Sequence, residues 1–290
     1  MVITIFTPLY NRAKFLERIY DSLLKQNDLE IEWIIVDDGS KDNPSEIINN
    51  IKKKSCFPIL LYTQENKGKH VAINKGINLA KGEFFFILDS DDFLPKNSIF
   101  ILRYQINKIK HQKDIAGVVG RRMYCDSTLI GDNFENPITS NSLDIRYKHN
   151  INGDLVEVFK IEVLKNYLFP EFKNEKFCPE ALVWNRIAQK FKLLFFNEPI
   201  YICEYLDDGL TDRIVKIRME SPVASMLTYS ELASYDVPFI QKVKACLNFW
   251  RFSFNSSKSI FFKLAQLKYK IAALLFPIGF IMFLKDKLKN

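Results

Sequence analysis

The sequence FFFILDSDDFLP, residues 84–95, joins an apolar run directly to a cluster of acids. The run Phe84–Leu88 carries no charge and predicts a buried β-strand, because strands covered on both faces are continuously apolar. Asp89, Asp91 and Asp92 follow it at once. Two carboxylates about 4 Å apart repel by roughly 4 kcal/mol at an effective dielectric constant of about 20. The cluster therefore indicates a site where a bound cation offsets this repulsion.

The residues around this stretch alternate between strand and helix patterns. Asn11 and Asn43 are predicted N-caps, and Pro44 suits the first position of a helix. Strands separated by helices predict a mostly parallel sheet covered on both faces, which is an α/β fold. The strands are predicted at 2–7, 32–38, 58–63 and 83–89, and the helices at 12–26, 43–54, 70–80 and from Pro95 on.

Polar side chains gather where three of the predicted strands end. Thr7–Tyr10 follow the first strand, Asp37–Ser40 the second and Asp89–Asp92 the fourth. Ligands of open α/β sheets bind at the carboxyl ends of the strands. The fold pattern and the chemistry therefore predict the same ligand site.

The acidic cluster favours a divalent cation with oxygen ligands. No set of His or Cys accompanies the aspartates, which suits Mg²⁺ or Mn²⁺. Magnesium is commonly held by one or two carboxylates together with substrate phosphates, so a nucleoside diphosphate is the expected ligand. The chain contains neither GxGxxG nor GxxxxGK[ST]. A metal and side chains, rather than a glycine-rich loop, are therefore expected to hold the phosphates.

Three other interpretations of the acids are weaker. They could lie at the N-terminus of a helix that opens near Pro95, where the helix dipole favours acids. An EF-hand loop would need an acid or Asn and then Gly where Phe93 and Leu94 stand. A phosphohydrolase of the DxDxT type would use Asp89 as its nucleophile, but Phe93 occupies the Thr position.

Residues 106–215 are less regular. Strands are predicted at 115–124 and 192–205, and helical or mixed patterns at 157–167 and 179–191. The five cysteines are scattered without a CxxC pair, which favours reduced thiols over a disulfide framework or a zinc ribbon. The first residues form a strand pattern and do not resemble an export signal.

The C-terminal part is helical in pattern from residue 216 and strongly basic near its end. Residues 241–290 contain ten Lys or Arg and one acid, a net charge of +9 against −2 for the remainder. Residues 258–270 are amphipathic, and 271–284 lack charge but fall short of the ~20 residues that span a bilayer. An in-plane or re-entrant membrane segment and a helix pair closing the core are both compatible. We expect 241–290 to bind an anionic membrane surface, and we expect no nucleic acid partner.

Five short motifs occur in order along the chain. Together they resemble family 2 glycosyltransferases with the GT-A fold, of the kind that builds bacterial polysaccharides. No single motif is decisive, but five in this order are specific. They are TPLYNR (7–12), VDDGS (36–40), NKGKHVAINKG (66–76), AKGEFFFILDSDD (80–92) and PEALVWNR (179–186).

The resemblance implies a nucleotide-sugar donor, commonly a UDP-sugar, and a divalent metal, Mg²⁺ or Mn²⁺, bound by Asp89 and Asp91. It implies that Asp38 faces the base. His70 is a lone histidine, and a structural role is its alternative. The nucleotide-sugar-binding residues implied by the motifs are Thr7, Pro8, Tyr10, Asp38, Asn66, His70, Asn74, Asp89 and Ser90.

Family members invert the anomeric carbon and use one carboxylate as the base, in many cases within a Glu-Asp pair. The matching place here reads Pro179-Glu180-Ala181, so the second acid is absent. Glu180 is the candidate catalytic base, and a helix N-terminal acid is its alternative. Asp154, after Gly153, is a candidate acceptor contact, with a plain turn as the alternative.

The resemblance implies a Rossmann-like GT-A fold in three parts. Residues 1–105 are the expected nucleotide-sugar-binding half, 106–215 the acceptor-binding half, and 216–290 a helical basic extension that attaches to a membrane surface. The expected function is metal-dependent, inverting transfer of a sugar to a hydroxyl of a lipid-linked saccharide in cell-surface polysaccharide synthesis. The expected location is cytoplasmic, peripheral on the inner face of the cell membrane. The alternative is a non-catalytic GT-A protein that binds a nucleotide sugar or scaffolds an assembly.

Overall fold

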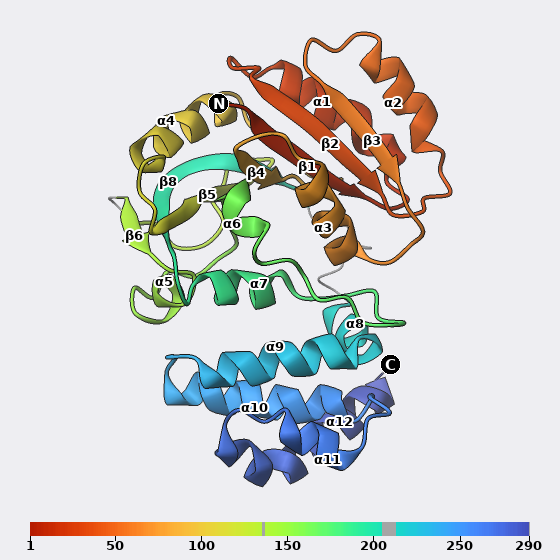
Figure 1. Cartoon of the computed structure of the whole chain (residues 1–290), viewed down its shortest axis with the longest axis vertical. Coiled ribbons are helices and arrows are strands. Elements are labelled where there is room, and N and C mark those ends of the chain that lie inside the picture. Colours follow the sequence, from red (N-terminus) through yellow and green to blue (C-terminus); the bar gives the residue numbers. More distant parts are fainter. Residues whose placement is uncertain (135–136, 205–212, 290) are drawn as a thin grey trace. The chain divides into compact units, whose positions relative to one another are not determined.

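The computed structural model describes residues 1–134, 137–204 and 213–289 (Figure 1). Its strands are β1 (Ile3–Leu9), β2 (Ile31–Asp37), β3 (Ile59–Thr63), β4 (Phe84–Ile87), β5 (Ile115–Tyr124), β6 (Ile138–Ser140), β7 (Leu155–Lys160) and β8 (Lys192–Cys203). Its α-helices are α1 (Leu16–Leu24), α2 (Pro44–Lys52), α3 (Lys69–Leu79), α4 (Ser98–Ile109), α5 (Asp144–Tyr147), α6 (Ile161–Leu164), α7 (Glu180–Ile187), α8 (Ile214–Glu220), α9 (Pro222–Ser234), α10 (Phe239–Ser253), α11 (Ile260–Ala265) and α12 (Phe276–Lys289). The 3₁₀ helices are η1 (Ala13–Phe15) and η2 (Lys270–Leu275).

The strands form an eight-stranded sheet in the order β3-β2-β1-β4-β7-β5-β8-β6. Strand β1 pairs in parallel with β2 and β4, β2 pairs in parallel with β3, and β5 pairs in parallel with β8. Strand β7 runs antiparallel between β4 and β5, and β6 runs antiparallel to β8. The predicted α/β fold with a mostly parallel sheet is confirmed.

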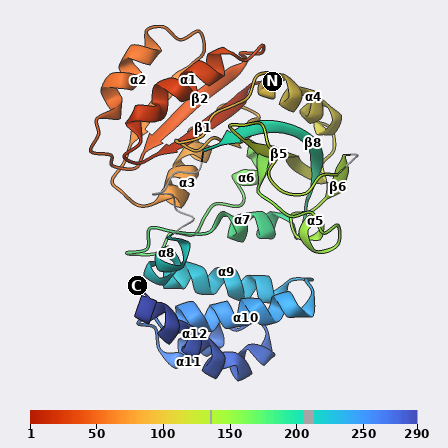
Figure 2. The ribbon, with the colours of Figure 1, turned by 180° about the vertical axis from the view of Figure 1, so that it is seen from behind.

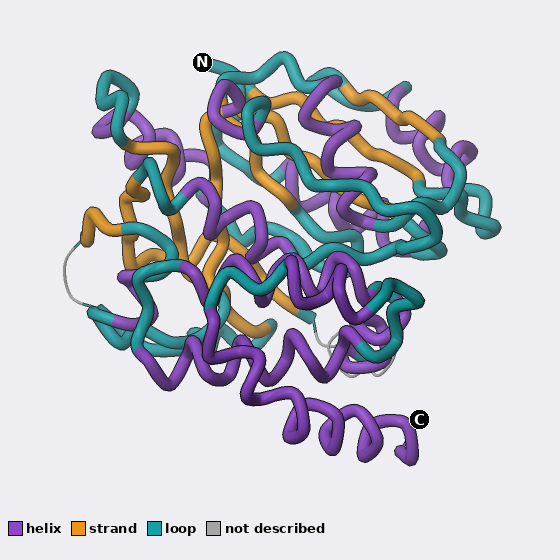
Figure 3. Tube along the Cα trace, turned by 60° about the horizontal axis from the view of Figure 1, so that its bottom comes forward, coloured by secondary structure: helices purple, strands orange, loops and turns teal. Residues whose placement is uncertain are grey.

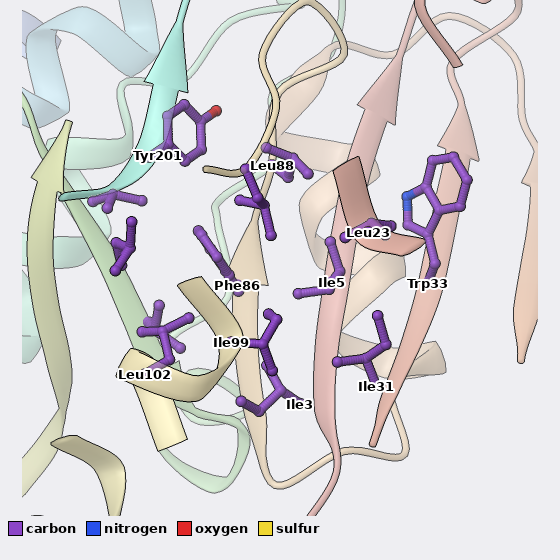
Figure 4. Packing of buried hydrophobic residues seen from close by; sticks show 14 of the residues in the cluster. Ile3, Ile5, Leu23, Ile31, Trp33, Phe86, Leu88, Ile99, Leu102 and Tyr201 are labelled. Carbon is purple, nitrogen blue, oxygen red and sulfur yellow. The ribbon is translucent and has the colours of Figure 1, made fainter. Parts of the chain in front are cut away.

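Helices cover both faces of the sheet. Figure 4 shows Ile3 and Ile5 of β1 packed in one core with Leu23 of α1 and Ile99 of α4. On the opposite face Phe6 lies against α3, where a Cβ on Gly76 would come within 2.3 Å of the Phe6 ring. Seen from behind, α1 and α2 lie in front of the strands (Figure 2). Alternate residues of one strand therefore serve two layers of helices.

The start of the first predicted helix is different in the structure. Asn11 is not an N-cap: it has a φ of 52°, its backbone N–H donates to Oγ of Ser40, and its Oδ1 accepts from the N–H of Lys41. These bonds join the end of β1 to the turn after β2, and the helix begins later, with η1 and α1. Asn43 has a φ of 53° and makes no side-chain cap, whereas Pro44 is the first residue of α2 as predicted.

The chain leaves the sheet immediately before the acids. Strand β4 ends at Ile87, although the N–H of Leu88 still donates to the carbonyl of Phe6 at 2.8 Å. The next N–H, of Asp89, donates to the side-chain hydroxyl of Tyr201 at 2.9 Å and not to the backbone carbonyl of a neighbouring strand. The acids therefore lie at the carboxyl edge of the parallel strands, as the sequence predicted.

The less regular middle of the chain resolves into separate elements. Strand β5 has the predicted bounds, and the strand predicted at 192–205 is β8. The mixed pattern at 157–167 divides into the end of β7 and α6, and 179–191 contains α7.

The described residues divide into two compact units. The described residues of Met1–Leu168 and Ile187–Tyr205 form the first, which contains the sheet. Those of Phe169–Arg186 and Leu206–Asn290 form the second. The segment Phe169–Arg186 therefore belongs with the C-terminal helices.

From Ile214 on, the described residues of the second unit are mainly helical, and Figure 3 draws the C-terminal end of the chain as helix. Trp250 of α10 is fully buried, and the ring centroid of Phe254 lies 5.2 Å from that of Phe276 and 5.0 Å from that of Phe280 in α12. A Cβ on Gly279 would lie 2.3 Å from Cβ of Trp250, so glycine permits this close approach of α12 to α10. Across the described ranges, every helix is too short or too polar to cross a bilayer.

Candidate active site

The acidic loop, residues 89–92 after β4, is held by two hydrogen bonds to the end of β8. The backbone N–H of Asp89 bonds to the Tyr201 hydroxyl, and the backbone N–H of Glu204 donates to Oδ1 of Asp92 at 3.0 Å. Asp92 is 6% exposed, whereas the side chain of Asp89 is 25% exposed and Asp91 is half-buried. The bonds to β8 bury Asp92, whereas the side chains of Asp89 and Asp91 stay accessible to a ligand.

Positive side chains balance Asp89. Nζ of Lys69, the first residue of α3, lies 2.6 Å from Oδ1 of Asp89. The guanidinium of Arg122 lies 4.5 Å from the ring centroid of Tyr201, beside the same loop. Burial acts to raise the pKa of Asp89, but the charges of Lys69 and Arg122 outweigh it and hold the pKa below its ordinary value. Asp89 is therefore ionised at neutral pH.

The pKa values of the other two carboxylates of the loop are raised. Burial, and then the charge of Asp89, raise the pKa of Asp91. The same two causes raise the pKa of Asp92 to about 7. Acids that raise one another's pKa form a site where an added positive charge is favourable.

Asp89 and Asp91 fit the chemistry of Mg²⁺ or Mn²⁺. Both offer partly exposed carboxylate oxygens, and the charge of Asp89 helps to raise the pKa of Asp91. Within the described residues, three or more His, Cys, Asp or Glu side chains are nowhere grouped to hold a metal ion. Two carboxylates suffice for a cation whose remaining ligands are water and phosphate oxygens.

Asp38 orders the loop between β3 and α3. It is 4% exposed, and its Oδ1 accepts from Nε2 of Gln64 and from the N–H of Lys67, both at 2.8 Å. Its Oδ2 accepts from the N–H of Gly68 at 2.7 Å. Lys69 follows Gly68 directly, so Asp38 holds the backbone next to the lysine whose ammonium pairs with Asp89. Its contact with a base stays a prediction.

The end of β1 places its predicted residues at different depths. Thr7 is fully buried, and its Oγ1 accepts from Nε1 of Trp33 at 3.0 Å. Pro8 is buried in the strand, in register with Val36 of β2. Tyr10 is 48% exposed just beyond the strand. Of these residues Tyr10 is the one whose side chain is open to a ligand.

The predicted donor residues of 66–76 lie in or before α3. His70 and Asn74 are four residues apart on the same helix face, and both are buried, at 2% and 7% exposure. Asn66 is half-buried in the loop before the helix. The helix that carries His70 and Asn74 thus begins at Lys69, beside the acidic loop.

Arg18 of α1 is a site residue that the sequence did not reveal. Its guanidinium donates to the carbonyl of Asp91 and to the carboxylate of Glu204. It also lies 4.9 Å from the ring centroids of Phe15 and Phe93. Arg18 therefore connects the acidic loop to the end of β8. No motif in the sequence connected Arg18 with Asp91, which lies 73 residues further on. No motif pointed to Arg122 or Tyr201 either, which both follow Asp91.

Glu180 and Asp154 belong to different compact units. Glu180 is the first residue of α7, half-buried, in the second compact unit. Asp154 is exposed just before β7, in the first unit. The roles of both stay predictions.

Comparison with known proteins identifies the family. The model of the family Glycosyl transferase family 2 matches residues 4–163, more than half of the chain. The chain belongs to glycosyl transferase family 2. Glycosyltransferase GlyG of Streptococcus pneumoniae serotype 4 is 30% identical over 218 residues, 69% of this chain and 70% of that protein. An uncharacterized glycosyltransferase of Haemophilus influenzae is 33% identical over 181 residues, 61% of this chain and 69% of that protein.

These relatives show that the chain is an enzyme, a glycosyltransferase. The poly-beta-1,6-N-acetyl-D-glucosamine synthase of Staphylococcus aureus is also similar, at 32% identity over 130 residues. That match covers 44% of this chain and 31% of the synthase. The resemblance to family 2 drawn from the five motifs is confirmed.

Solved structures confirm the GT-A fold. Residues 1–349 of S. aureus TarS in complex with UDP-GlcNAc superpose with a TM-score of 0.62 at 16% identity, covering 98% of this chain and 89% of that chain. Mannosyltransferase PcManGT from Pyrobaculum calidifontis, in complex with GDP-Man and Mn²⁺, gives a TM-score of 0.58 at 15% identity over 99% of this chain and 86% of that chain. At these identities the likeness concerns the fold.

Proposed function

We propose that this glycosyltransferase transfers a sugar from a UDP-sugar to a saccharide hydroxyl, with inversion and with a divalent metal. The observation that carries the proposal is the acidic loop, whose accessible Asp89 and Asp91 lie at the carboxyl edge of β4 beside Lys69. Support for the donor comes from TarS, a structural neighbour solved with UDP and with UDP-GlcNAc. Support for the metal comes from PcManGT, solved with Mn²⁺.

The donor diphosphate lies at the acidic loop in this proposal. Asp89 and Asp91 would hold Mg²⁺ or Mn²⁺, which when bound stabilises negative charge on the departing diphosphate. Lys69 shields Asp89 and offers an ammonium to the phosphates. Ser90 contributes to the same loop, next to the donor.

The nucleoside lies at the ends of β1 and β2. Tyr10 offers an exposed ring, Thr7 and Pro8 shape the buried floor, and Asp38 holds the loop before α3. Asn66, His70 and Asn74 flank the donor sugar from α3 and the loop before it. Residues 1–105 are thereby the donor half, and 106–215 the acceptor half.

Glu180 is the proposed base. Its carboxylate accepts the proton of the acceptor hydroxyl as that oxygen attacks the anomeric carbon from the face opposite the diphosphate. A single displacement of this kind needs one carboxylate at the sugar, unlike the close pair of a retaining glycosidase. Asp154 contacts the acceptor.

The acceptor is a lipid-linked saccharide in this proposal, because the second unit exposes an apolar and basic surface. Phe261, Leu274, Ile281 and Leu288 are 79%, 78%, 65% and 89% exposed. Exposed lysines lie among them in sequence: Lys258, Lys268, Lys285 and Lys287. Exposed apolar side chains interspersed in sequence with exposed lysines suit the interface of an anionic bilayer. The enzyme would act as a peripheral protein on the cytoplasmic face of the cell membrane, in polysaccharide synthesis.

A thermal-shift screen tests the donor and the metal together. The thermal midpoint is measured with UDP, UDP-sugars, GDP and GDP-sugars, each with Mn²⁺, Mg²⁺ or EDTA. A ligand at 100 times its dissociation constant stabilises by about 2.7 kcal/mol, so a bound UDP-sugar raises the midpoint by several degrees. We expect this rise with UDP compounds and a metal but not in EDTA. Equal midpoints in every condition would contradict the proposal.

A further inference from the structure

The segment Phe169–Arg186, which carries Glu180, packs with the C-terminal helices in one compact unit. Within the segment, the rings of Phe169 and Trp184 meet edge to face with centroids 5.8 Å apart. Two sets of contacts then join the segment to α9, one on each side of Glu180. They are made by Glu175 and Arg186.

Arg186 forms a two-pronged ion pair with Glu231 of α9. Nε of Arg186 donates to Oε2 of Glu231 at 2.8 Å, and Nη2 donates to Oε1 at 3.0 Å. Paired parallel bonds of this kind fix both distance and orientation. Arg186 is six residues after Glu180, near the end of the same helix α7.

Glu231 is itself held by further donors. The hydroxyl of Tyr235 donates to its Oε2 at 3.0 Å, and Nζ of Lys268 lies 3.6 Å from its Oε1. The Glu231 side chain is 10% exposed. Burial acts to raise the pKa of Glu231, but the hydrogen bonds and charge of Arg186 outweigh it and keep the pKa below its ordinary value. Glu231 is therefore an ionised, nearly buried anchor for α7.

Glu175 anchors the segment on the other side of Glu180. Its Oε1 accepts from the N–H of Val223 at 2.7 Å, and its Oε2 accepts from the N–H of Ala224 at 2.8 Å. These N–H groups belong to the first turn of α9, where helix donors lack partners within the helix. Glu175 is five residues before Glu180, so both flanks of Glu180 are bound to α9.

We propose that the Arg186–Glu231 pair positions the carboxylate of Glu180, so that the C-terminal helices are part of the catalytic machinery. This inference rests on the proposed role of Glu180 as the base. Arg186 and Glu231 are positioning residues: they hold α7 and do not touch the substrate. A displacement of about 1 Å in a catalytic group can lower the rate about 100-fold. Loss of the pair is therefore expected to lower kcat and to spare donor binding.

The test compares two ion pairs of the second unit. Glu231→Gln removes the charge of the positioning pair. Asp286→Asn weakens the pair between Arg251 of α10 and Asp286 of α12, which is also two-pronged, with Nη2 2.7 Å from Oδ1, and which joins two helices other than α7. The measurements are kcat, the donor KM, donor affinity and the thermal midpoint. We expect Glu231→Gln to lower kcat about 10- to 100-fold with unchanged donor affinity, and Asp286→Asn to leave kcat within about twofold at a similar loss of stability.

Milder variants keep the test decisive if Glu231→Gln does not fold. Arg186→Lys retains the charge but loses the two-pronged geometry, and Tyr235→Phe removes one hydrogen bond to Glu231. Both are expected to lower kcat less than Glu231→Gln, in the order Arg186→Lys and then Tyr235→Phe. Folded variants with wild-type kcat would overturn the inference, as would equal falls of kcat in the Glu231 and Asp286 variants.

Glu180→Gln, measured in parallel, separates the two proposals. Wild-type transfer by Glu180→Gln overturns the base assignment, and the positioning inference with it. Loss of transfer in Glu180→Gln together with wild-type kcat in Glu231→Gln overturns the positioning inference alone.

Discussion

The two compact units encode their functional residues in different ways. In the first, the acids of the candidate donor site are neighbours in sequence, and a strand end suffices to bring them together. In the second, the segment that carries Glu180 is joined to α9 by contacts such as Arg186 to Glu231, which are 45 residues apart. A site formed by one loop can be recognised from a short motif, whereas a residue held by distant helices cannot.

The second unit also combines two features that the sequence presented separately. The segment with Glu180 and the exposed apolar residues near the C-terminus belong to the same unit. The proposed membrane surface and the proposed base for a lipid-linked acceptor are therefore parts of one compact unit. The first unit then supplies the donor chemistry.

The largest effect is expected from the proposed base in the second unit. Glu180→Gln should lower kcat by about 10²–10⁴-fold, since it removes the group proposed to accept the acceptor proton, while donor binding in the first unit survives. Glu220→Gln, an exposed glutamate of α8 in the same unit, is the matched control. Transfer is measured with a labelled donor, and a variant that transfers at the wild-type rate would contradict this division of roles.

The next effect concerns the proposed metal site of the first unit. Asp91→Asn should weaken the Mn²⁺-dependent part of UDP affinity by about 100-fold, because changes around a metal's ligands already cost 10- to 100-fold. Titration calorimetry with UDP, with and without Mn²⁺, measures it. Asp114→Asn, exposed and outside the acidic loop, should bind as the wild type does. Equal UDP affinity in Asp91→Asn and wild type would remove the metal from this loop.

A pH dependence of stability should mark the acidic loop. Asp92 has a folded-state pKa of about 7, raised from 3.8 by burial and by Asp89. The folded state then binds more protons than the unfolded state between these values. The free energy of unfolding of the metal-free protein should therefore fall as pH rises from 4 to 7, by up to a few kcal/mol, since one pKa unit is about 1.4 kcal/mol.

Urea unfolding of the metal-free protein at several pH values in this window measures the slope. Asp92→Asn should flatten it, because Asn keeps an acceptor for the N–H of Glu204 but does not titrate. A wild-type stability that rises between pH 5 and 7 would show that Asp92 is not held neutral by the loop.

The smallest effect is expected from single residues of the proposed membrane surface. Phe261→Ser should weaken binding to anionic vesicles about tenfold, since burial of such a side chain contributes about 1.5–3 kcal/mol. Phe100→Ser, on α4 of the first unit and 61% exposed, is the control. Co-flotation measures both. Removal of 241–290 is less informative, because it also deletes most of α10 and the core around Trp250.

Much of the first unit followed from local pattern. Strands β1–β4 appear close to their predicted ranges, because apolar runs of five to seven residues between helices can be buried only inside a covered sheet. The start of α1 was missed because Asn11 bonds across to Ser40 and Lys41, a contact with a strand end that no local rule contains. Arg18 was missed for the same reason, since its partners Asp91 and Glu204 come from two distant elements.

The sequence alone determined the family, the α/β order of the first hundred residues, the position of the acids at a strand end and the basic character of the C-terminal part. These depend on residue type and spacing, which act over a few residues. Only the tertiary structure decided that Lys69 and Arg122 face Asp89, that Asp38 binds the loop before α3, and that the segment with Glu180 joins the C-terminal helices. Such contacts join residues tens of positions apart, and a free-energy minimum shared by the whole chain selects them.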